Sequence, residues 1–232
     1  KMKAILSTTL HDDYLLNLPY AIMSWNKLGI DVKVMIAEDD AYSTVFQKYI
    51  VNFDIDFEIQ TYKCSEDRKP TYSQVSRLFG AIGENNDEIL ITSDADMVVL
   101  SDEYFRNDTP TIVGYDLADG MIPMCYTYMT SKQWKQVMNI KNTDTLQSRL
   151  SELIDVIDCD NIRGNYWCLD QELLTKHIND SGLEFTKISR RNSGGTATRR
   201  CDRDGWNPNG DYIDAHLPRP FDLDKIMKAG FF

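Results

Sequence analysis

The sequence has few of the groups that hold zinc, and no two of its cysteines are separated by only two residues. It contains three histidines and five cysteines in 232 residues. The cysteines are Cys64, Cys125, Cys159, Cys168 and Cys201. An odd number of scattered cysteines is typical of reduced thiols rather than of a disulfide framework or a zinc site. Together with an N-terminus that lacks a secretory pattern, this predicts a soluble, cytoplasmic protein.

Positive charge and long apolar runs are also scarce. The chain has 25 Lys and Arg against 36 Asp and Glu, a formal net charge of −11 at pH 7. Binding to nucleic acid or to anionic lipid is therefore not expected as its main activity. No apolar run approaches the roughly 18–20 residues that a membrane span needs, so no transmembrane segment is expected. An acidic chain that binds a phosphorylated ligand needs a metal ion or a local basic cluster.

What the sequence does contain is an alternation of strand-like and helix-like segments. Strands are expected at Lys3–Thr9, Asp31–Ala37, Phe57–Tyr62, Glu88–Leu100, Thr111–Tyr115 and Met124–Met129. Helices are expected before Gly29, around Ala41–Phe53, and at Thr71–Gly83, Ser131–Ile140, Asp144–Ile157 and Asp170–His177. This order predicts an α/β fold with a mostly parallel central sheet and helices on both faces.

Two aspartates interrupt the most apolar of these segments, ILITSDADMVVL. Asp94 and Asp96 follow the apolar run Ile89–Ile91 and precede the run Met97–Leu100. Two carboxylates this close repel each other unless a cation lies between them. Ligands bind at the carboxyl ends of strands in open α/β sheets, and carboxylate pairs suit Mg²⁺ or Mn²⁺. The pattern favours a divalent-metal site, with a simple turn as the alternative.

Four motifs follow one another along the chain: TTLHDDYLLNLPYAIMSWNKLG, YSQVSRLFGAIGENNDEILITSDADMVVL, WCLDQELL and DAHLPRP. Together they resemble the GT-A fold glycosyltransferases, most closely the retaining family 8 type that includes bacterial lipopolysaccharide galactosyltransferases and glycogenin. The resemblance covers about residues 3–220. It implies a Rossmann-like GT-A domain over residues 1–232, with a nucleotide-sugar-binding half at 1–100 and an acceptor-binding, catalytic half at 101–232.

The resemblance also implies roles for individual residues. Contacts to the nucleotide or donor would come from Thr8, Thr9, Asp12, Asp13, Tyr14, Arg77, Asp94 and Arg219. Tyr14 would stack on the uracil, and Arg77 would steady the aspartate pair. A Mn²⁺ or Mg²⁺ ion would be held by Asp94, Asp96 and His216. The residues nearest the anomeric carbon would be Asp170 and Gln171.

Several of these residues also have an ordinary structural explanation. Asp12 and Asp13 could cap the following helix, and Asp170 could favour a helix start through the helix dipole. The sequence also departs from family 8 in two places. MIPMCYTYMT replaces an Asn-Ala-Gly segment, so the donor sugar is not carried over. Arg219 is the cation nearest to the position of the family's lysine after the histidine.

The resulting prediction is a metal-dependent glycosyltransferase that moves a sugar from a UDP-sugar to a hydroxyl acceptor, a glycan or glycoconjugate, with retention. Inversion would require a carboxylate base, for which Asp116, Asp119 and Glu172 are candidates. Cationic side chains of a glycine-containing segment could close over the donor, namely Arg190, Arg191, Arg199, Arg200 and Arg203.

Three other classes stay open. A nucleotidyltransferase would share the acids and the metal, but STTLHDD lacks the glycines and the nearby cation of its usual phosphate loop. A non-catalytic module that binds a UDP-sugar or a carbohydrate would need no metal. A divalent-metal phosphohydrolase would need further acids or histidines close to the aspartate pair.

Overall fold

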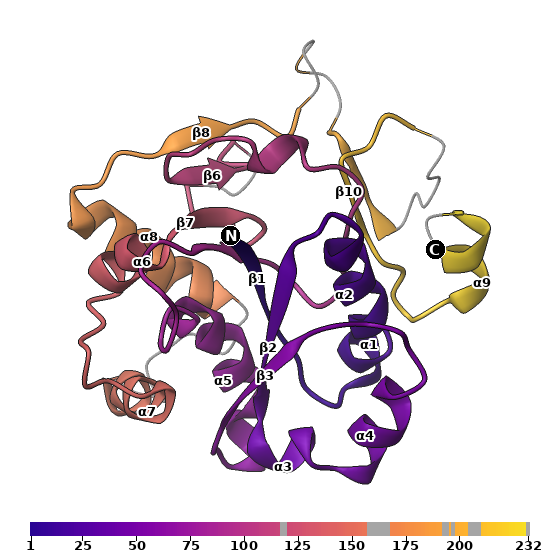
Figure 1. The fold of residues 1–232 in the computed structure, drawn as a ribbon, viewed down its shortest axis with the longest axis horizontal. Helices are drawn as coiled ribbons and strands as arrows, with labels where there is room; N and C mark the ends of the chain where they lie inside the picture. Colours follow the sequence, from indigo (N-terminus) through magenta and orange to yellow (C-terminus); the bar gives the residue numbers. More distant parts are fainter. Residues whose placement is uncertain (117–119, 157–167, 192–194, 196–197, 204–209, 231–232) are drawn as a thin grey trace.

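A computed structural model of the protein describes residues 1–116, 120–156, 168–191, 195, 198–203 and 210–230. Its centre is a seven-stranded sheet in the order β3-β2-β1-β4-β7-β6-β8 (Figure 1). The strands are β1 (Met2–Ser7), β2 (Asp31–Ala37), β3 (Glu58–Tyr62), β4 (Ile89–Thr92), β6 (Thr111–Val113), β7 (Thr127–Thr130) and β8 (Thr186–Ile188). Neighbouring strands are parallel except where β7 pairs with β4 and β6. The predicted mostly parallel α/β sheet is confirmed.

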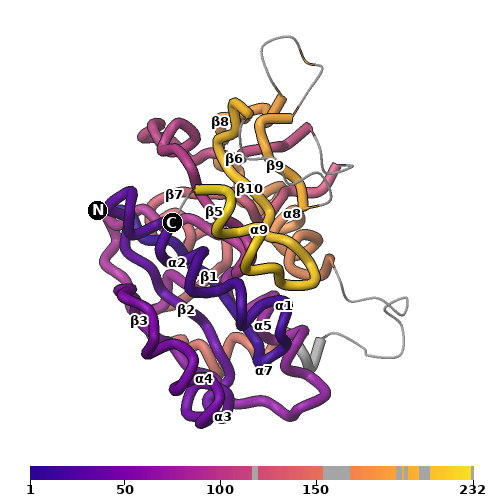
Figure 2. Tube along the Cα trace, turned by 90° about the vertical axis from the view of Figure 1, so that its right-hand side faces the viewer, coloured from indigo at the N-terminus to yellow at the C-terminus, as the bar shows by residue number. Residues whose placement is uncertain are grey.

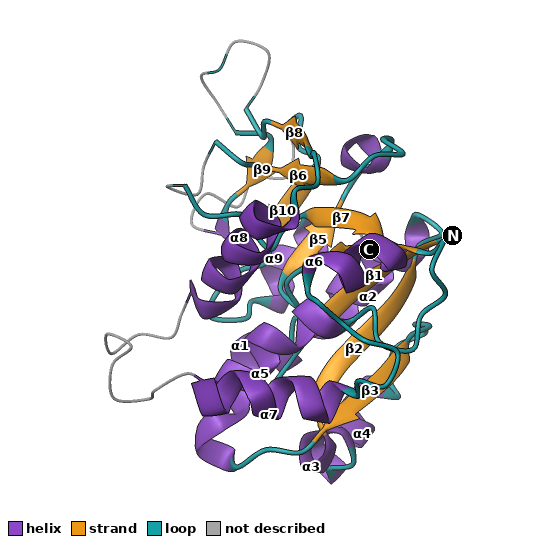
Figure 3. Ribbon diagram, turned by 90° about the vertical axis from the view of Figure 1, so that its left-hand side faces the viewer, coloured by secondary structure: helices purple, strands orange, loops and turns teal. Residues whose placement is uncertain are grey.

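Helices flank this sheet (Figure 3). They are α1 (Asp12–Leu15), α2 (Leu18–Lys27), α3 (Glu38–Ala41), α4 (Thr44–Ile50), α5 (Lys69–Ser76), α6 (Ser131–Val137), α7 (Leu146–Val156), α8 (Leu169–Ser181) and α9 (Leu223–Lys228). Short 3₁₀ turns span Glu66–Arg68, Arg77–Phe79 and Glu103–Phe105. In the described part of the chain, no helix has the length and apolar character needed to cross a membrane.

The residues of β1 show why both faces of the sheet are covered. Ala4 and Leu6 belong to one apolar core, and Ile5 between them belongs to another. This follows from the alternation of side chains along a strand. Trp25 of α2 packs in the first core and Val75 of α5 in the second, and both side chains are fully buried. The sheet therefore lies between two helical layers. Functional side chains of the sheet are expected at the ends of its strands, because both of its faces are covered.

A second, three-stranded sheet forms where one long strand was expected (Figure 2). It contains β5 (Met97–Val99), β10 (Asp214–His216) and β9 (Arg200–Cys201). The prediction of a single strand over Glu88–Leu100 is wrong, because β4 ends at Thr92 in the central sheet and β5 belongs to the smaller one. The amide of Met97 donates to the Asp94 carbonyl at 3.3 Å, which closes a turn between them. The two aspartates thus lie outside both sheets.

The small sheet brings the C-terminal part of the chain to the aspartates. In the antiparallel pairing of β10 with β5, His216 lies opposite Met97. The amide of Leu217 then donates to the Asp96 carbonyl at 2.8 Å. His216 therefore reaches the aspartate pair through backbone pairing alone, across more than a hundred residues of sequence.

Local capping explains where two expected helices changed. The helix expected around Ala41–Phe53 is divided into α3 and α4, because the Ser43 hydroxyl accepts from the Phe46 amide at 3.1 Å and starts a new helix. The helix expected over Thr71–Gly83 begins earlier, at Lys69, and tightens into the 3₁₀ turn Arg77–Phe79. That turn directs Arg77 toward the end of β4.

Candidate active site at the end of the central sheet

Three potential metal ligands meet beyond the carboxyl end of β4. Asp94, Asp96 and His216 each offer one ligand atom, and these atoms all lie within 4.8 Å of one another. The two aspartates come from the turn between β4 and β5, and His216 is the last residue of β10. A set of two carboxylates and one imidazole suits a divalent cation such as Mn²⁺. Below, these three residues are called the triad.

Charge and burial leave two members of the triad in the form that binds metal. Burial, together with the positive charge of the nearby Arg200, lowers the pKa of His216 to about 4. Its imidazole is therefore neutral at pH 7, with a lone pair free for coordination. Burial opposes ionisation of Asp94, but Arg77 outweighs this and holds the pKa of that carboxyl well below its usual range.

Arg77 joins the triad to the start of α8. Its side chain is buried, and it forms an ion pair with Asp94 while donating to the Ser93 carbonyl at 2.8 Å. The other terminal nitrogen donates to Asp170 Oδ2 at 2.7 Å. One guanidinium thus holds Asp94 and Asp170 in fixed positions on either side of it, rather than lying solvated at a helix edge.

Asp170 is the second residue of α8 and is 3% exposed. Burial raises its pKa to about 6, the Arg77 guanidinium opposes that rise, and the negative charge of Asp94 adds to it. Asp170 Oδ1 also accepts from the Gln171 amide at 2.9 Å. Gln171 itself is partly exposed. The Asp170 carboxyl is therefore buried and held by hydrogen bonds from Arg77 and from the Gln171 amide. Its pKa lies near neutral pH.

Asp96 is neutralised by two arginines from the C-terminal part of the chain. Its Oδ2 atom accepts from Arg219 at 2.7 Å and from Arg203 at 3.2 Å. The Arg219 guanidinium also lies over the ring of Tyr14, with 4.6 Å between its carbon and the ring centroid. Tyr14 is part of α1, so Arg219 links the triad to the helix that follows β1.

The remaining residues predicted to bind the nucleotide surround the start of α1. The Thr8 amide donates to the Met35 carbonyl at 3.2 Å and its hydroxyl to the Thr9 carbonyl at 3.0 Å. The residue that caps α1 is His11, whose side chain accepts from the Asp13 amide. Asp12 and Asp13 lie in the first turn and not at the capping position, so the alternative explanation that they cap this helix is wrong. As acids in a first turn they still favour the helix dipole.

The five arginines expected to close over the donor do not behave alike. Arg200 forms a two-point ion pair with buried Asp214, at 2.9 and 2.6 Å, and Arg190 is buried against the Tyr126 ring. These two belong to the core. Arg199 pairs with Glu103 at 2.5 Å. Among the described residues, only Arg203 of the five forms an ion pair with the triad.

The candidates for a base in an inverting reaction are spread apart. Asp116 accepts from the Ser189 hydroxyl at 2.7 Å and lies 3.6 Å from Arg191. Glu172 is exposed on α8. Asp119 lies outside the described residues. None of the described candidates forms an ion pair or hydrogen bond with the triad.

Two contacts at the triad have no signal in the sequence. Cys125 Sγ accepts from the Asp94 amide at 3.1 Å, and Arg203 reaches Asp96 from a segment more than a hundred residues away. Both depend on which strands pair, β7 beside β4 in one case and β9 beside β10 in the other. A charged or polar residue in an irregular segment gives no local indication of such a partner.

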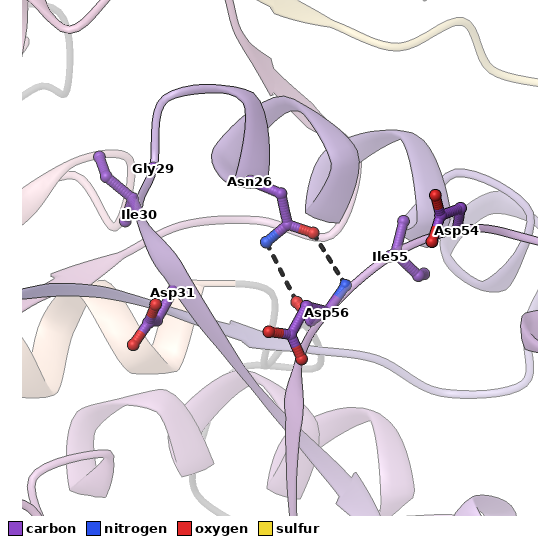
Figure 4. A pocket seen from close by; sticks show the side chains of 7 residues that line it. All are labelled: Asn26, Gly29, Ile30, Asp31, Asp54, Ile55 and Asp56. Carbon is purple, nitrogen blue, oxygen red and sulfur yellow. Dashed lines mark hydrogen bonds between the residues drawn. The ribbon is translucent and has the colours of Figure 1, made fainter.

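A separate hollow lies at the other end of the sheet (Figure 4). It has a volume of about 400 Å³ and is lined by residues between α2 and β2 and before β3, among them Asp31, Asp54 and Asp56. Asn26 braces it through two hydrogen bonds with the Asp56 backbone, at 3.1 and 3.0 Å. Asp31 begins β2, whereas the triad follows the end of β4, which runs in the same direction. The hollow therefore has no part in the triad's chemistry.

Comparison with known proteins gives no family for this chain. No family model matches it, and no curated protein matches it. Among solved structures it is similar to a 4-diphosphocytidyl-2C-methyl-D-erythritol synthase from Anaerococcus prevotii DSM 20548, with 11% identity, a TM-score of 0.42, and coverage of 81% of this chain and 88% of that one. A second enzyme of the same name gives 11% identity, a TM-score of 0.37, and coverage of 76% and 98%.

A mannose-6-phosphate isomerase from Helicobacter pylori gives 13% identity and a TM-score of 0.36 over 49% of this chain. The match spans 50% of the isomerase. None of these three structures is named as a glycosyltransferase. Because no family model matches the chain, the resemblance to family 8 stays a prediction from the sequence.

Proposed function

We propose that the protein is a metal-dependent transferase that acts on a nucleoside diphosphate sugar, with glycosyl transfer from a UDP-sugar as the first candidate. The observation that carries this proposal is the convergence of Asp94, Asp96 and His216 beyond the end of β4. In an α/β sheet this is where ligands bind. An otherwise acidic chain also gathers Arg77, Arg203 and Arg219 there, which suits an anionic ligand.

The triad fits the divalent cation that this proposal requires. His216 is neutral and Asp94 is ionised at pH 7, as coordination demands. A bound Mn²⁺ or Mg²⁺ ion would neutralise the diphosphate leaving group as negative charge develops on it. The imidazole favours Mn²⁺ over Mg²⁺, which prefers an all-oxygen shell.

The protein's own residues would bind and orient the donor around this point. Tyr14 would stack on the uracil, with Thr8, Thr9, Asp12 and Asp13 beside it, because an aromatic face offers area and rigidity. Arg219 and Arg203 would contact the diphosphate, since a guanidinium matches the geometry of phosphate oxygens. Both side chains are about one-fifth exposed, so they can turn toward a ligand.

Asp170 and Gln171 would act on the sugar. The Asp170 carboxyl is mostly ionised at pH 7 because its pKa is about 6. An anion held there by Arg77 would stabilise positive charge on the anomeric carbon while its bond to the diphosphate oxygen breaks. The acceptor oxygen would form the new bond from the same face and lose its proton to the departing diphosphate oxygen, which gives retention.

Nucleotidyl transfer is the second candidate. The same acids and metal would serve it, and two of the structures reported above are named for a diphosphocytidyl compound. TM-scores of 0.37 and 0.42 leave this choice to experiment. The segment Thr8–His11 contains no glycine, lysine or arginine with which to hold a triphosphate.

The first test is thermal unfolding with UDP, GDP, CMP or ADP, each with Mn²⁺ or with EDTA. A ligand that binds only the folded state raises the midpoint of unfolding. We expect a shift with UDP that requires Mn²⁺ and that disappears in Asp94→Ala. Asp39→Ala is the matched control, because Asp39 is an exposed acid on α3. No shift with any nucleotide in the presence of Mn²⁺ would overturn the proposal.

A second assay separates the two candidates. A glycosyltransferase releases UDP from a UDP-sugar, slowly to water and faster with an acceptor. A nucleotidyltransferase joins a sugar phosphate to a nucleoside triphosphate and releases pyrophosphate from the triphosphate. Pyrophosphate without UDP release would assign the second candidate instead of the first.

A further inference from the structure

Arg219 contacts both parts of the candidate site at once. Its terminal nitrogen donates to Asp96 Oδ2 at 2.7 Å, and its guanidinium carbon lies 4.6 Å from the centre of the Tyr14 ring. Asp96 is a member of the triad, and Tyr14 is the residue proposed to stack on the base. Among the described residues, Arg219 is the one with a contact of both kinds.

Each of these contacts competes with a ligand. Asp96 Oδ2 already accepts from Arg219 at 2.7 Å and from Arg203 at 3.2 Å, so a cation beside this oxygen would be repelled by both guanidinium charges. A cation coordinated by Asp96 Oδ2 would take over the lone pair that Arg219 now uses. In the same way, a base stacked on this face of Tyr14 would occupy the space of the guanidinium.

We propose that Arg219 couples metal binding to nucleotide binding by acting as a counter-ion that both ligands displace. The inference rests on the proposed function above. A base that stacks on Tyr14 moves Arg219 away from Asp96 and so frees the triad for a cation. A cation that binds the triad frees Tyr14 for the base. Because binding linkage is reciprocal, each ligand must raise the affinity for the other by the same factor.

The displaced guanidinium would then be available to the diphosphate. Its side chain is 21% exposed while it is paired, so it lies at the surface of the site and needs no opening of the core to move. The same residue would thus neutralise Asp96 when the site is empty and the phosphates when it is full. The affinity of the site for the cation would thus depend on whether the nucleotide is bound, and the affinity for the nucleotide on whether the cation is bound.

Arg203 provides a matched control inside the site. It donates to the same Asp96 Oδ2 atom, at 3.2 Å, and its side chain is 23% exposed. No contact between Arg203 and the Tyr14 ring is found in the described structure. Removing either positive charge should strengthen cation binding, but only the loss of Arg219 should abolish the coupling.

The test uses uridine rather than UDP, because uridine has no phosphate and cannot bridge to the metal by itself. The Mn²⁺ affinity of the full chain is measured by calorimetry with and without saturating uridine. For the unmodified protein we expect uridine to tighten Mn²⁺ binding about five- to tenfold, the range of ordinary coupling between sites. Arg219→Gln should bind Mn²⁺ more tightly without uridine and show no further effect of uridine.

Two variants complete the design. Arg203→Gln should bind Mn²⁺ more tightly and retain the effect of uridine. Arg199→Gln removes the same charge from a residue paired with Glu103, and it should match the unmodified protein in both measurements. Thermal unfolding of each variant in EDTA verifies that it is folded before titration.

The outcomes separate this inference from the proposed function. If the unmodified protein binds Mn²⁺ and uridine but neither affects the other, or if Arg219→Gln retains the coupling, Arg219 does not link the two sites and the inference is overturned alone. If the unmodified protein binds no Mn²⁺, the proposed function fails and takes the inference with it.

Discussion

The central sheet carries a cluster of buried charges toward each end, and the two clusters are built differently. Toward the amino ends of the strands, Lys3 of β1 lies 2.8 Å from Glu84 and 3.8 Å from Glu88, and Lys33 of β2 pairs with the same Glu84. The side chains of Lys3, Lys33 and Glu84 are each at most 7% exposed. Burial alone would raise the pKa of Glu84, but the two ammonium groups outweigh it and hold that pKa below its ordinary value.

The cluster beyond the carboxyl ends uses arginines where the other uses lysines. Its acids are equally buried at Asp96 and Asp170, but Arg203 and Arg219 are about one-fifth exposed and can leave Asp96 for another partner. It also holds a neutral imidazole, which offers a lone pair and needs no counter-ion. Buried charge by itself therefore does not identify a site. Partners that can be exchanged, beside ligands that converge, are the feature that distinguishes the triad.

The largest effect on stability is expected at the amino end. Glu84→Gln leaves the buried Lys33 without a carboxylate partner among the described residues, whereas Lys3 keeps Glu58 at 2.9 Å. Breaking a buried pair in this way costs about 3–5 kcal/mol of the free energy of unfolding. Urea denaturation in EDTA measures it. The Mn²⁺-dependent stabilisation by UDP should persist in this variant. A loss below about 1 kcal/mol would show that the two clusters do not differ as described.

The next effect depends on pH and concerns Asp170. Its pKa is about 6 in the folded protein against an ordinary value of 3.8, so the folded state binds more protons than the unfolded state between these values. The stability conferred by this carboxyl is therefore fully present below about pH 4 and is lost as the pH rises through 6. As the pH rises from 4 to 7, the free energy of unfolding of Asp170→Asn should therefore increase by about 2–3 kcal/mol relative to that of the unmodified protein.

The measurement is urea denaturation of both proteins across this range in EDTA, because a bound cation would alter the field at Asp170. Taking the difference between the two proteins matters, since His216 titrates with the opposite sign. Its folded pKa of about 4 lies below the ordinary 6.5, so its contribution is lost as the pH falls. A difference that stays constant with pH would contradict the raised pKa of Asp170.

How far the sequence predicts this molecule differs between its two halves. The strand expected at Asp31–Ala37 is β2 to the residue, and Phe57–Tyr62 is β3 with one residue fewer. These strands have seven and five residues, long enough for a strand pattern to be recognised, and β2 is buried along nearly its whole length. β9 and β10 have two and three residues, too few for any periodicity, and they were not predicted.

The site shows the same limit. The aspartate pair was conspicuous because carboxylates are costly beside a buried strand. His216 was connected to it only through the resemblance to a family, and the structure now places both together. Arg203 was one of five arginines expected near the donor, but its pairing with Asp96 has no local pattern in the sequence. The same holds for the contact of Cys125 with Asp94, because both arise from strand pairing between distant segments.

The smallest effect on stability, and the sharpest comparison with Glu84→Gln, is expected from Asp96→Asn. Each variant turns one buried acid with two cationic partners into an amide of nearly the same shape. At Asp96 the partners are Arg203 and Arg219, which can turn into solvent, so we expect a loss of no more than about 1 kcal/mol. The Mn²⁺-dependent shift with UDP should nevertheless disappear, because a triad ligand is gone.

Urea denaturation and thermal unfolding of the two variants, measured side by side, should therefore give opposite results. Glu84→Gln should lose stability and keep the response to the ligand, whereas Asp96→Asn should keep its stability and lose that response. If Asp96→Asn instead destabilises the fold as much as Glu84→Gln does, its arginines are fixed structural partners, and the carboxyl-end cluster is no more exchangeable than the other.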